Sequence, residues 1–181
     1  MRLIIISAVS SNGVIGVGSE IPWHVPEDFK HFKETTMGHP VVVGLNTFKT
    51  LPEKALLGRT YLVLSGNEDI SENLRYNVHF FENMSSLLDY IKLNYSHLDE
   101  EVYIAGGQSI YDQFIDNCDE CIITWIDKVI PYSSLDDVKI FPTIPLVMKY
   151  VCTFTSSWST SIKGLNYKIY KYTNKKKYVN T

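Results

Sequence analysis

Short apolar runs rich in β-branched residues alternate along this chain with segments of helical periodicity, and this alternation is what most constrains the fold. The apolar runs lie at residues 3–9, 41–43, 61–64, 78–81 and 102–105. The helical patterns lie at residues 26–36, 84–93 and 109–114, with a further short one from Asn46. Parallel strands covered by helices on both faces have this rhythm. The sequence therefore predicts an α/β fold with a mostly parallel central sheet and flanking helices.

The pattern changes after a further strand at residues 121–126. Residues 149–156 and 165–172 look like strands with no helix between them, which predicts a C-terminal antiparallel edge pair. With 181 residues, 45% of them hydrophobic, the chain can bury one sizeable core. We expect one domain over residues 1–173 and a polar, flexible tail over residues 174–181.

The overall charge and hydropathy exclude several classes of partner. Seventeen lysines and arginines stand against twenty aspartates and glutamates, a net charge of −3, so nothing global points to nucleic acid. No stretch approaches the roughly 18 apolar residues of a membrane span, and residues 1–9 look like a buried strand rather than a secretory signal. We expect a cytoplasmic protein, a monomer, with no nucleic-acid or membrane partner.

The cysteines and histidines give little sign of a metal or redox site. Cys118 and Cys121 have redox spacing, but they fall between a helix end and a strand rather than at a helix N-terminus, which favours an inert structural role. Cys152 makes the number odd, unlike a disulfide scaffold. The five histidines lack ligand spacing, so no metal is expected; they are His24, His31, His39, His79 and His97.

One carboxylate stands out. The glycine-punctuated stretch from Gly16 leads to Pro26, a residue suited to the first helical position, and then to Asp28. Helical spacing places Phe32 on the face of Asp28, with Phe29 beside it. Two interpretations remain open here: a catalytic carboxylate facing an aromatic surface, or an acid that merely complements the helix dipole.

Three strand ends carry features of a nucleotide site. Gly44 ends one strand and precedes a helix start at Asn46-Thr47, Ser65-Gly66 ends another, and Gly106-Gly107 ends a third. In open α/β sheets ligands bind at such ends, where backbone N–H groups and glycines admit phosphates. A glycine after a strand is also an ordinary turn signal. Their joint occurrence favours a dinucleotide, although the G-x-G-x-x-G fingerprint is missing after the first strand.

Arg59 supplies a positive charge near the predicted site. It immediately precedes the strand at residues 61–64, on the side of the helix that carries Asp28. Arginine suits bidentate recognition of a carboxylate. An exposed arginine after a turn is the alternative interpretation.

These residues together resemble the dihydrofolate reductase family, from residue 1 to about residue 172. The matching motifs are Ala8, Val14-Ile15-Gly16, Ile21-Pro22-Trp23, Asp28 with Phe32-Lys33, Val43-Gly44 with Thr47, Leu57-Gly58-Arg59, Leu64-Ser65, Ile104-Ala105-Gly106-Gly107 with Tyr111, and Thr124. Aspartate in Pro26-Glu27-Asp28 resembles the bacterial or phage form of the family. The implied activity is NADPH-dependent reduction of 7,8-dihydrofolate to 5,6,7,8-tetrahydrofolate.

The resemblance also implies roles for individual residues. Asp28 orients the pterin through paired hydrogen bonds and favours its protonation through water, Thr124 completes that network, and Trp23 organises the water. Arg59 pairs with the glutamate carboxylate of folate. The implied substrate-binding residues are Ile6, Val9, Asp28, Phe29, Phe32, Lys33, Leu51, Leu56, Arg59, Ala105, Tyr111 and Thr124.

For the cofactor, the resemblance implies a loop up to Ile21 that closes over the nicotinamide, and a cis peptide bond between Gly106 and Gly107. The implied NADPH-binding residues are Ala8, Val14, Ile15, Gly16, Gly18, Ser19, Glu20, Ile21, Gly44, Leu45, Asn46, Thr47, Leu64, Ser65, Gly66, Asn67, Gly106, Gly107, Gln108, Ser109, Ile110 and Tyr111.

The chain departs from the family pattern in two regions. Many relatives have basic residues where this chain has Leu45, Glu82 or Asn83, and Gln108-Ser109, so the extra phosphate of NADPH is left with Ser65, Asn67 and Arg75 as candidate partners. The family's Asp-Thr-Phe-Phe-Pro motif is displaced by one position at residues 137–142, and we expect loop closure near Asp137 to differ.

Three alternatives to a dihydrofolate reductase remain. A pyrimidine reductase of riboflavin synthesis shares the fold but does not need Asp28 and Arg59 together. A non-catalytic pterin-binding protein would bind without turnover. A redox or interaction module would depend on Cys118 and Cys121.

Overall fold

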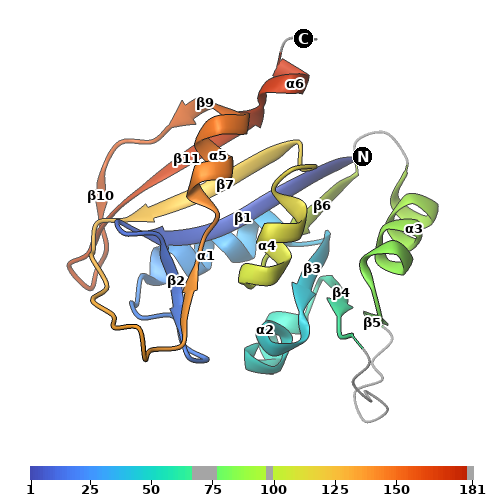
Figure 1. Ribbon diagram of the computed structural model, residues 1–181, viewed down its shortest axis with the longest axis horizontal. Helices are drawn as coiled ribbons and strands as arrows, with labels where there is room; N and C mark the ends of the chain where they lie inside the picture. Colours follow the sequence, from blue (N-terminus) through green and yellow to red (C-terminus); the bar gives the residue numbers. More distant parts are fainter. Residues whose placement is uncertain (67–76, 97–99, 179–181) are drawn as a thin grey trace.

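One nine-stranded sheet organises the chain in this computed structural model, which describes residues 1–66, 77–96 and 100–178 (Figure 1). The strands follow the order β10-β11-β7-β1-β6-β3-β4-β5, and β9 pairs with β11. Their bounds are β1 (Arg2–Ser10), β3 (Pro40–Gly44), β4 (Thr60–Leu64), β5 (Val78–Phe81), β6 (Glu101–Ile104), β7 (Glu120–Ile126), β9 (Tyr150–Thr155), β10 (Ser159–Thr160) and β11 (Asn166–Asn174). The predicted α/β architecture is confirmed.

The parallel half of the sheet explains the apolar runs. Strand β1 pairs in parallel with both β6 and β7, so that Ile5 lies opposite Ile104 on one side and Cys121 on the other. Strands β3, β4 and β5 extend the parallel arrangement. Ile4 and Ile5 are 2% and 0% exposed. Because both faces of these strands are covered, consecutive side chains must be apolar.

Helices cover the two faces of the sheet as separate layers. The helices are α1 (Pro26–Thr36), α2 (Leu45–Thr50), the 3-10 helix η1 (Glu53–Leu56), α3 (Met84–Tyr95), α4 (Gln108–Phe114), α5 (Thr143–Lys149) and α6 (Lys175–Tyr178). On one face, α3, α4 and α5 supply Leu87, Phe114 and Leu146 to a buried cluster. On the other face, α1, α2 and η1 pack Phe32, Phe48 and Leu56 against the sheet.

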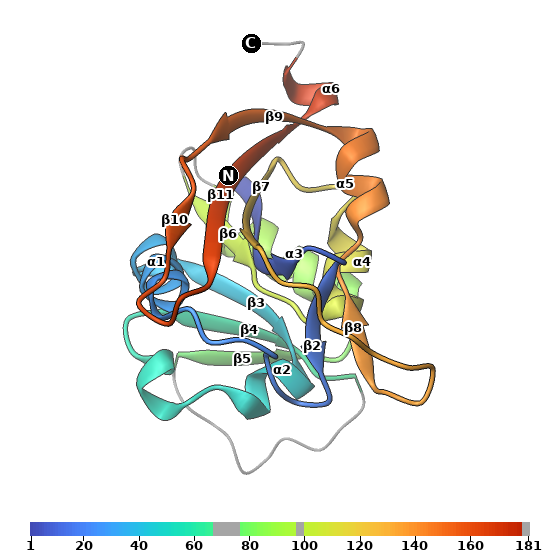
Figure 2. The ribbon, with the colours of Figure 1, turned by 90° about the vertical axis from the view of Figure 1, so that its left-hand side faces the viewer.

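The start of α1 is fixed by its sequence and by a distant hairpin. Pro26 occupies the first turn, where its missing N–H costs nothing. The Glu27 carboxylate accepts hydrogen bonds from the Ser161 hydroxyl at 2.7 Å and from the Ile162 backbone N–H at 2.8 Å. Figure 2 shows α1 beside β10 and the loop that these bonds attach. The position of Asp28 therefore depends on contacts far away in the chain.

A small second sheet lies beside the main one, where our sequence reasoning saw only a glycine-punctuated loop. Strand β2 (Val14–Val17) pairs antiparallel with β8 (Val138–Ile140). The Gly18 N–H donates to the Asp137 carbonyl at 2.8 Å, and the side chain of Asp137 forms an ion pair with Lys139. Residues 137–142, which are displaced by one position from the family motif, therefore still contact the loop after β2 through the backbone of Asp137.

The C-terminal strands differ from the prediction in their neighbours. The antiparallel pair β9 and β11 is confirmed, but β11 also pairs with β7, so β11 lies inside the sheet and its partners β9 and β10 lie on its outer side. Helix α5, which the sequence analysis did not predict, contains Pro145. Proline is tolerated there because it falls in the first turn.

The predicted boundary of the tail at residue 174 also differs from the structure. Asn174 ends β11, is 6% exposed, and its side-chain amide donates to the Cys118 carbonyl at 3.0 Å. Lys175 begins α6 and donates to the Met148 carbonyl at 2.7 Å. The fold therefore extends beyond residue 173. Within the described ranges, no helix is long and apolar enough to cross a membrane.

We expect Phe114→Ala to lower the free energy of unfolding by about 3–5 kcal/mol, because it empties a site in the core. The Phe114 side chain is 1% exposed. Urea denaturation followed by circular dichroism measures the loss. The control is Phe154→Ala on β9, whose side chain is 50% exposed and whose removal is expected to change stability by less than about 1 kcal/mol. Equal losses in the two variants would contradict the assignment of the core.

Candidate active site

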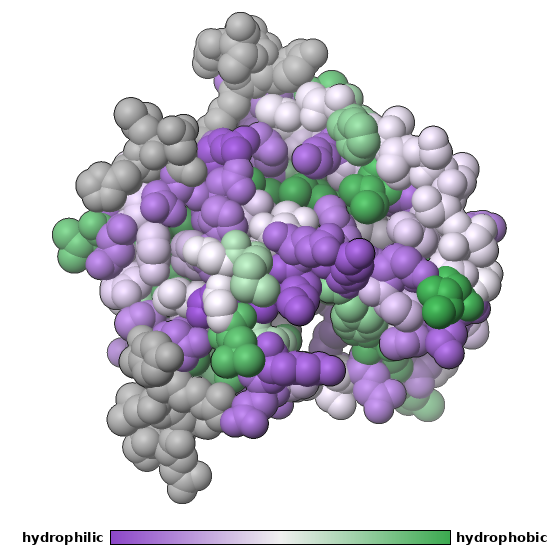
Figure 3. All heavy atoms as spheres, turned by 180° about the vertical axis from the view of Figure 1, so that it is seen from behind, coloured by the Kyte–Doolittle hydropathy of each residue, from purple (hydrophilic) through white to green (hydrophobic). Residues whose placement is uncertain are grey.

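A cleft of about 1840 Å³ opens at the carboxyl ends of the parallel strands. The ends of β1, β3, β4 and β6 contribute to its floor, and α1, α2 and the loop after β2 form its walls. In the space-filling view, the surface is hollowed between the loop after β2 and α2 (Figure 3). Ligands of open α/β sheets bind at this edge.

Most of the predicted site residues meet in this cleft. The predicted residues that line it are Ile6, Ala8, Ile15, Gly16, Gly18, Ser19, Glu20, Ile21, Trp23, Asp28, Phe29, Phe32, Lys33, Gly44, Leu45, Asn46, Thr47, Leu51, Arg59, Leu64, Ser65, Gly66, Ala105, Gly107, Gln108, Ser109, Ile110 and Tyr111. Elements far apart in the sequence supply them, so the cleft exists only in the folded chain.

Five of the predicted residues that the structure describes do not line the cleft: Gly106 and Thr124 are buried beside it, and three apolar residues lie in the core. Val9 and Val14 are 0% exposed and Leu56 is 7% exposed. Val9 fails to reach the cleft because side chains alternate along β1, which puts it on the opposite face from Ile6 and Ala8. The cofactor candidates Asn67 and Arg75 fall outside the described residues.

Asp28 is half-buried in the first turn of α1, where it lines the cleft with Phe29 and Phe32. Burial disfavours the charged form and raises the pKa of the Asp28 carboxyl above its ordinary value. A hydrogen bond with the Thr124 side chain and the charge of His31 act in the opposite direction. A ligand that donates hydrogen bonds to this carboxylate would relieve its desolvation.

Thr124 interacts with this carboxylate, and Trp23 lines the same cleft. Thr124 is 2% exposed on β7, and its side chain interacts with Asp28 directly. Trp23 is 8% exposed, lines the cleft, and packs with Val25 and Ile126. The Thr124 hydroxyl is thus the polar partner of the carboxylate within the protein.

Arg59 is a buried cation, 5% exposed, and not the surface residue that one interpretation allowed. Its Nε donates to the Thr36 hydroxyl at 2.8 Å, and its terminal nitrogens donate to the carbonyls of Ala55 at 2.8 Å, Leu57 at 3.4 Å and Lys33 at 3.0 Å. A guanidinium has five N–H donors. Four of these donors are used by the bonds above, and the bond to Leu57 is the longest of them.

The diglycine segment brings backbone close to the cleft. The peptide bond between Gly106 and Gly107 is cis, as the resemblance implied. Gly106 has a φ of +96°, and a Cβ there would lie 2.8 Å from the Tyr111 ring. A Cβ on Gly107 would lie 3.1 Å from the Thr47 hydroxyl. Only glycine leaves this space open.

The residues present fit a dinucleotide. Gly44 and Gly107 directly precede α2 and α4, and neither of these described helix starts has a side-chain cap. Their first N–H groups remain available to ligand oxygens. Asn83, one of the departures from the family pattern, uses its side-chain oxygen to cap α3 through the Ser86 N–H at 3.0 Å.

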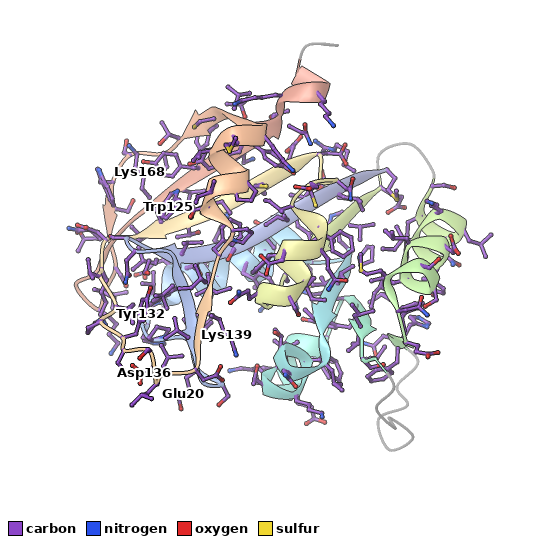
Figure 4. All side chains as sticks on the ribbon, in the orientation of Figure 1. Glu20, Trp125, Tyr132, Asp136, Lys139 and Lys168 are labelled. Carbon is purple, nitrogen blue, oxygen red and sulfur yellow. The ribbon has the colours of Figure 1, made fainter. Side chains whose placement is uncertain are left out.

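The loop after β2 forms the outer wall of this part of the cleft. Glu20 lies in the loop after β2, and Lys139 lies on β8 nearby (Figure 4). Both line the cleft. A backbone hydrogen bond from the Gly18 N–H to the Asp137 carbonyl anchors this loop next to β8.

Several residues of the site escaped the sequence analysis. They are Ser7, His24, His31, Thr36, Lys49 and Lys54. Thr36 matters because its hydroxyl accepts from Arg59 and donates to the Phe32 carbonyl at 2.7 Å. The only sequence signal for Thr36 was its spacing of four from Phe32 along the helix.

The cysteines lie outside the cleft. Cys118 and Cys121 are buried and not joined by a disulfide. Burial raises the pKa of the Cys121 thiol, which keeps it protonated and unreactive. This is the inert role favoured by the sequence.

We expect Asp28→Asn to raise the melting temperature at pH 7. The folded carboxyl has a raised pKa, so above the ordinary pKa the folded state holds more protons than the unfolded state, and wild-type stability falls as the pH rises through that window. Melting curves from pH 4 to pH 8 measure the effect. Asp89→Asn, an exposed change on α3, is the control. A melting temperature at pH 7 below that of the wild type would contradict this assignment.

Comparison with known proteins identifies the family. The sequence matches the dihydrofolate reductase family over residues 2–172. It is 32% identical to the dihydrofolate reductase of Mycobacterium tuberculosis over 171 residues, 93% of this chain and 95% of that protein. It is 35% identical to that of Neisseria gonorrhoeae over 144 residues, 80% of this chain and 81% of that protein.

A solved structure gives the same answer. The structure of Enterococcus faecalis dihydrofolate reductase complexed with NADP(H) and RAB-propyl superposes with a TM-score of 0.77 at 26% identity, covering 96% of each chain. The match over nearly the whole length favours this family over the pyrimidine reductases of riboflavin synthesis. The chain belongs to the dihydrofolate reductase family.

Proposed function

We propose that Asp28 and the side chains around it form the catalytic site at which this chain carries out the reaction of its family. That reaction is the reduction of 7,8-dihydrofolate to 5,6,7,8-tetrahydrofolate with NADPH. The observation that carries the proposal is the half-buried carboxylate of Asp28 at the cleft wall, with its charged form disfavoured by burial. Such a carboxylate gains most from a ligand with paired N–H donors.

Asp28 accepts hydrogen bonds from the ring N–H and the amino group of the pterin. This pairing orients the ring and favours its protonation, for which water is the carrier. Thr124 holds the carboxylate from the opposite side. Ile6, Phe32 and Leu51 form the apolar walls for the pterin and the benzoyl group.

The opposite end of the substrate lies toward Arg59. The cleft there is lined by Lys33 and Lys54 as well, so its charge complements the carboxylates of the glutamate. Arg59 lines this part of the cleft, and its hydrogen bond to the Thr36 hydroxyl holds the guanidinium in place. The distribution of charge along the cleft thus gives the substrate one direction.

NADPH, when bound, supplies the hydride, and the enzyme of Enterococcus faecalis was solved with NADP(H). Ala8, Ile15 and the loop from Gly16 to Ile21 hold the reduced ring against the pterin and exclude water. Gly107 and Thr47 leave space for the cofactor close to the backbone. Ser65 is the described candidate for contact with the extra phosphate of NADPH.

We also propose a monomer that works in the cytoplasm. The residues of a single chain line the whole cleft, so a partner copy has nothing to add to it. The three cysteines form no disulfide in the described structure, as is usual in a reducing compartment. Light scattering after size exclusion measures the oligomeric state.

We expect the protein to oxidise NADPH when dihydrofolate is added, and Asp28→Asn to lower kcat/KM at pH 7 about 100-fold or more. Asparagine keeps the size of the side chain but cannot accept two hydrogen bonds with a full negative charge. Loss of NADPH absorbance measures turnover. Part of the rate returns at acidic pH, where the substrate is already protonated.

Two outcomes would separate the alternatives. Wild-type rates in Asp28→Asn would contradict the role of Asp28. Stoichiometric binding of dihydrofolate without turnover in the unaltered protein would indicate a non-catalytic pterin-binding protein.

We expect Arg59→Lys to raise the KM for dihydrofolate about tenfold or more while the KM for NADPH changes little. Lysine keeps the charge but loses the planar fork that matches a carboxylate. Steady-state kinetics with dihydrofolate and with dihydropteroate, which lacks the glutamate, measure the effect. A loss of the same size for both substrates would place Arg59 away from the glutamate. Lys92→Arg on α3, an exposed exchange of one cation for another, is the control.

A further inference from the structure

His31 is a half-buried titratable group to which the proposed reaction assigns no role. It lies on α1 three residues after Asp28, so the two side chains share one face of the helix. Its Nδ1 lies 3.4 Å from the Thr35 hydroxyl. Its Nε2 is buried, and it is the one buried side-chain nitrogen or oxygen without a hydrogen-bond partner among the residues that the structure describes.

Charged groups from two elements act on this ring. Burial is the main cause that holds the pKa of His31 below its ordinary value, and Lys171 on β11 adds to that effect. Asp28 and Glu34 on α1 act in the opposite direction, and Asp28 is the stronger of the two. The imidazole is therefore neutral at pH 7, while its strongest charge partner is the carboxylate of the site.

The coupling between the two side chains is mutual. A proton on His31 lowers the pKa of Asp28, because a positive charge nearby favours the ionised carboxylate. The same interaction free energy appears in the titration of each partner. When the pH falls, the ring and the carboxyl thus titrate as a pair.

We propose that His31 is a positioning residue that keeps Asp28 ionised, and so able to hold the pterin, when the pH falls below neutral. The inference rests on the proposed role of Asp28. A proton on His31 favours the ionised form of Asp28, and the resulting pair of opposite charges keeps the negative charge in the cleft. His31 does not touch the substrate in this arrangement, since it acts through Asp28.

The kinetic test compares the pH profile of kcat/KM in the wild type and in His31→Gln. Glutamine is polar and does not titrate. Dividing kcat/KM of the variant by that of the wild type at each pH removes the effect of substrate protonation, which is the same for both enzymes. We expect this ratio to stay within about twofold at pH 7.5 and to fall about three- to tenfold at pH 5.5. His79→Gln, on the distant strand β5, is the matched control and leaves the ratio constant.

A ratio that does not change with pH in His31→Gln would overturn the proposal, because a side chain that only fills space affects all pH values equally. His31→Phe, which keeps an aromatic ring but cannot take a proton, should reproduce the pH-dependent loss. A wild-type profile in His31→Phe would likewise overturn it.

A titration of the histidine ring by NMR tests the coupling without using activity. Asp28→Asn removes the favourable charge and should lower the pKa of His31, whereas Lys171→Gln removes a repulsive charge from an exposed position and should raise it. A His31 titration that neither change moves would overturn the coupling. Opposite shifts, together with wild-type turnover in Asp28→Asn, would instead locate the failure in the proposed role of Asp28.

Discussion

The parallel pairing of β1 with both β6 and β7 is the constraint on which the rest of the structure depends. Strand β1 is at the centre of the sheet, and β3, β4 and β6 run parallel to it. The carboxyl ends of these four strands therefore lie along one edge of the sheet. That edge carries the floor of the cleft. The glycines that follow the strands then leave the backbone accessible to a ligand.

Helix α1 links the two charged ends of the cleft. Asp28 lies in the first turn of α1, and Thr36 is its last residue. The Thr36 hydroxyl accepts a hydrogen bond from Nε of Arg59, and the Lys33 carbonyl accepts another from the same guanidinium. Eight residues of helix separate Asp28 from Thr36, a rise of about 12 Å. The length of α1 thus sets the distance between the carboxylate and the cation, and His31 lies between them on the same helix.

The elements predicted correctly are those whose burial can be inferred from the residue types within the element itself. The strand at residues 78–81 and the start of the helix at Pro26 agree with the structure because apolar and aromatic residues in a short run and a proline at a helix start are local signals. Strand β2 and helix α5 were missed. Strand β2 has only four residues and pairs with a strand far along the chain, and α5 contains a proline. The local sequence of each therefore cannot be distinguished from that of a loop.

The sequence by itself determined the α/β class, the family resemblance, and the identity of Asp28, Arg59 and the diglycine as functional candidates, because these depend on residue type and order. Only the tertiary structure decided that Arg59 is buried and held by Thr36, that Val9 lies in the core, and that His31 acts on Asp28 beside Lys171. The physical reason is that desolvation and charge coupling depend on which elements pack together, and packing joins residues that the sequence keeps far apart.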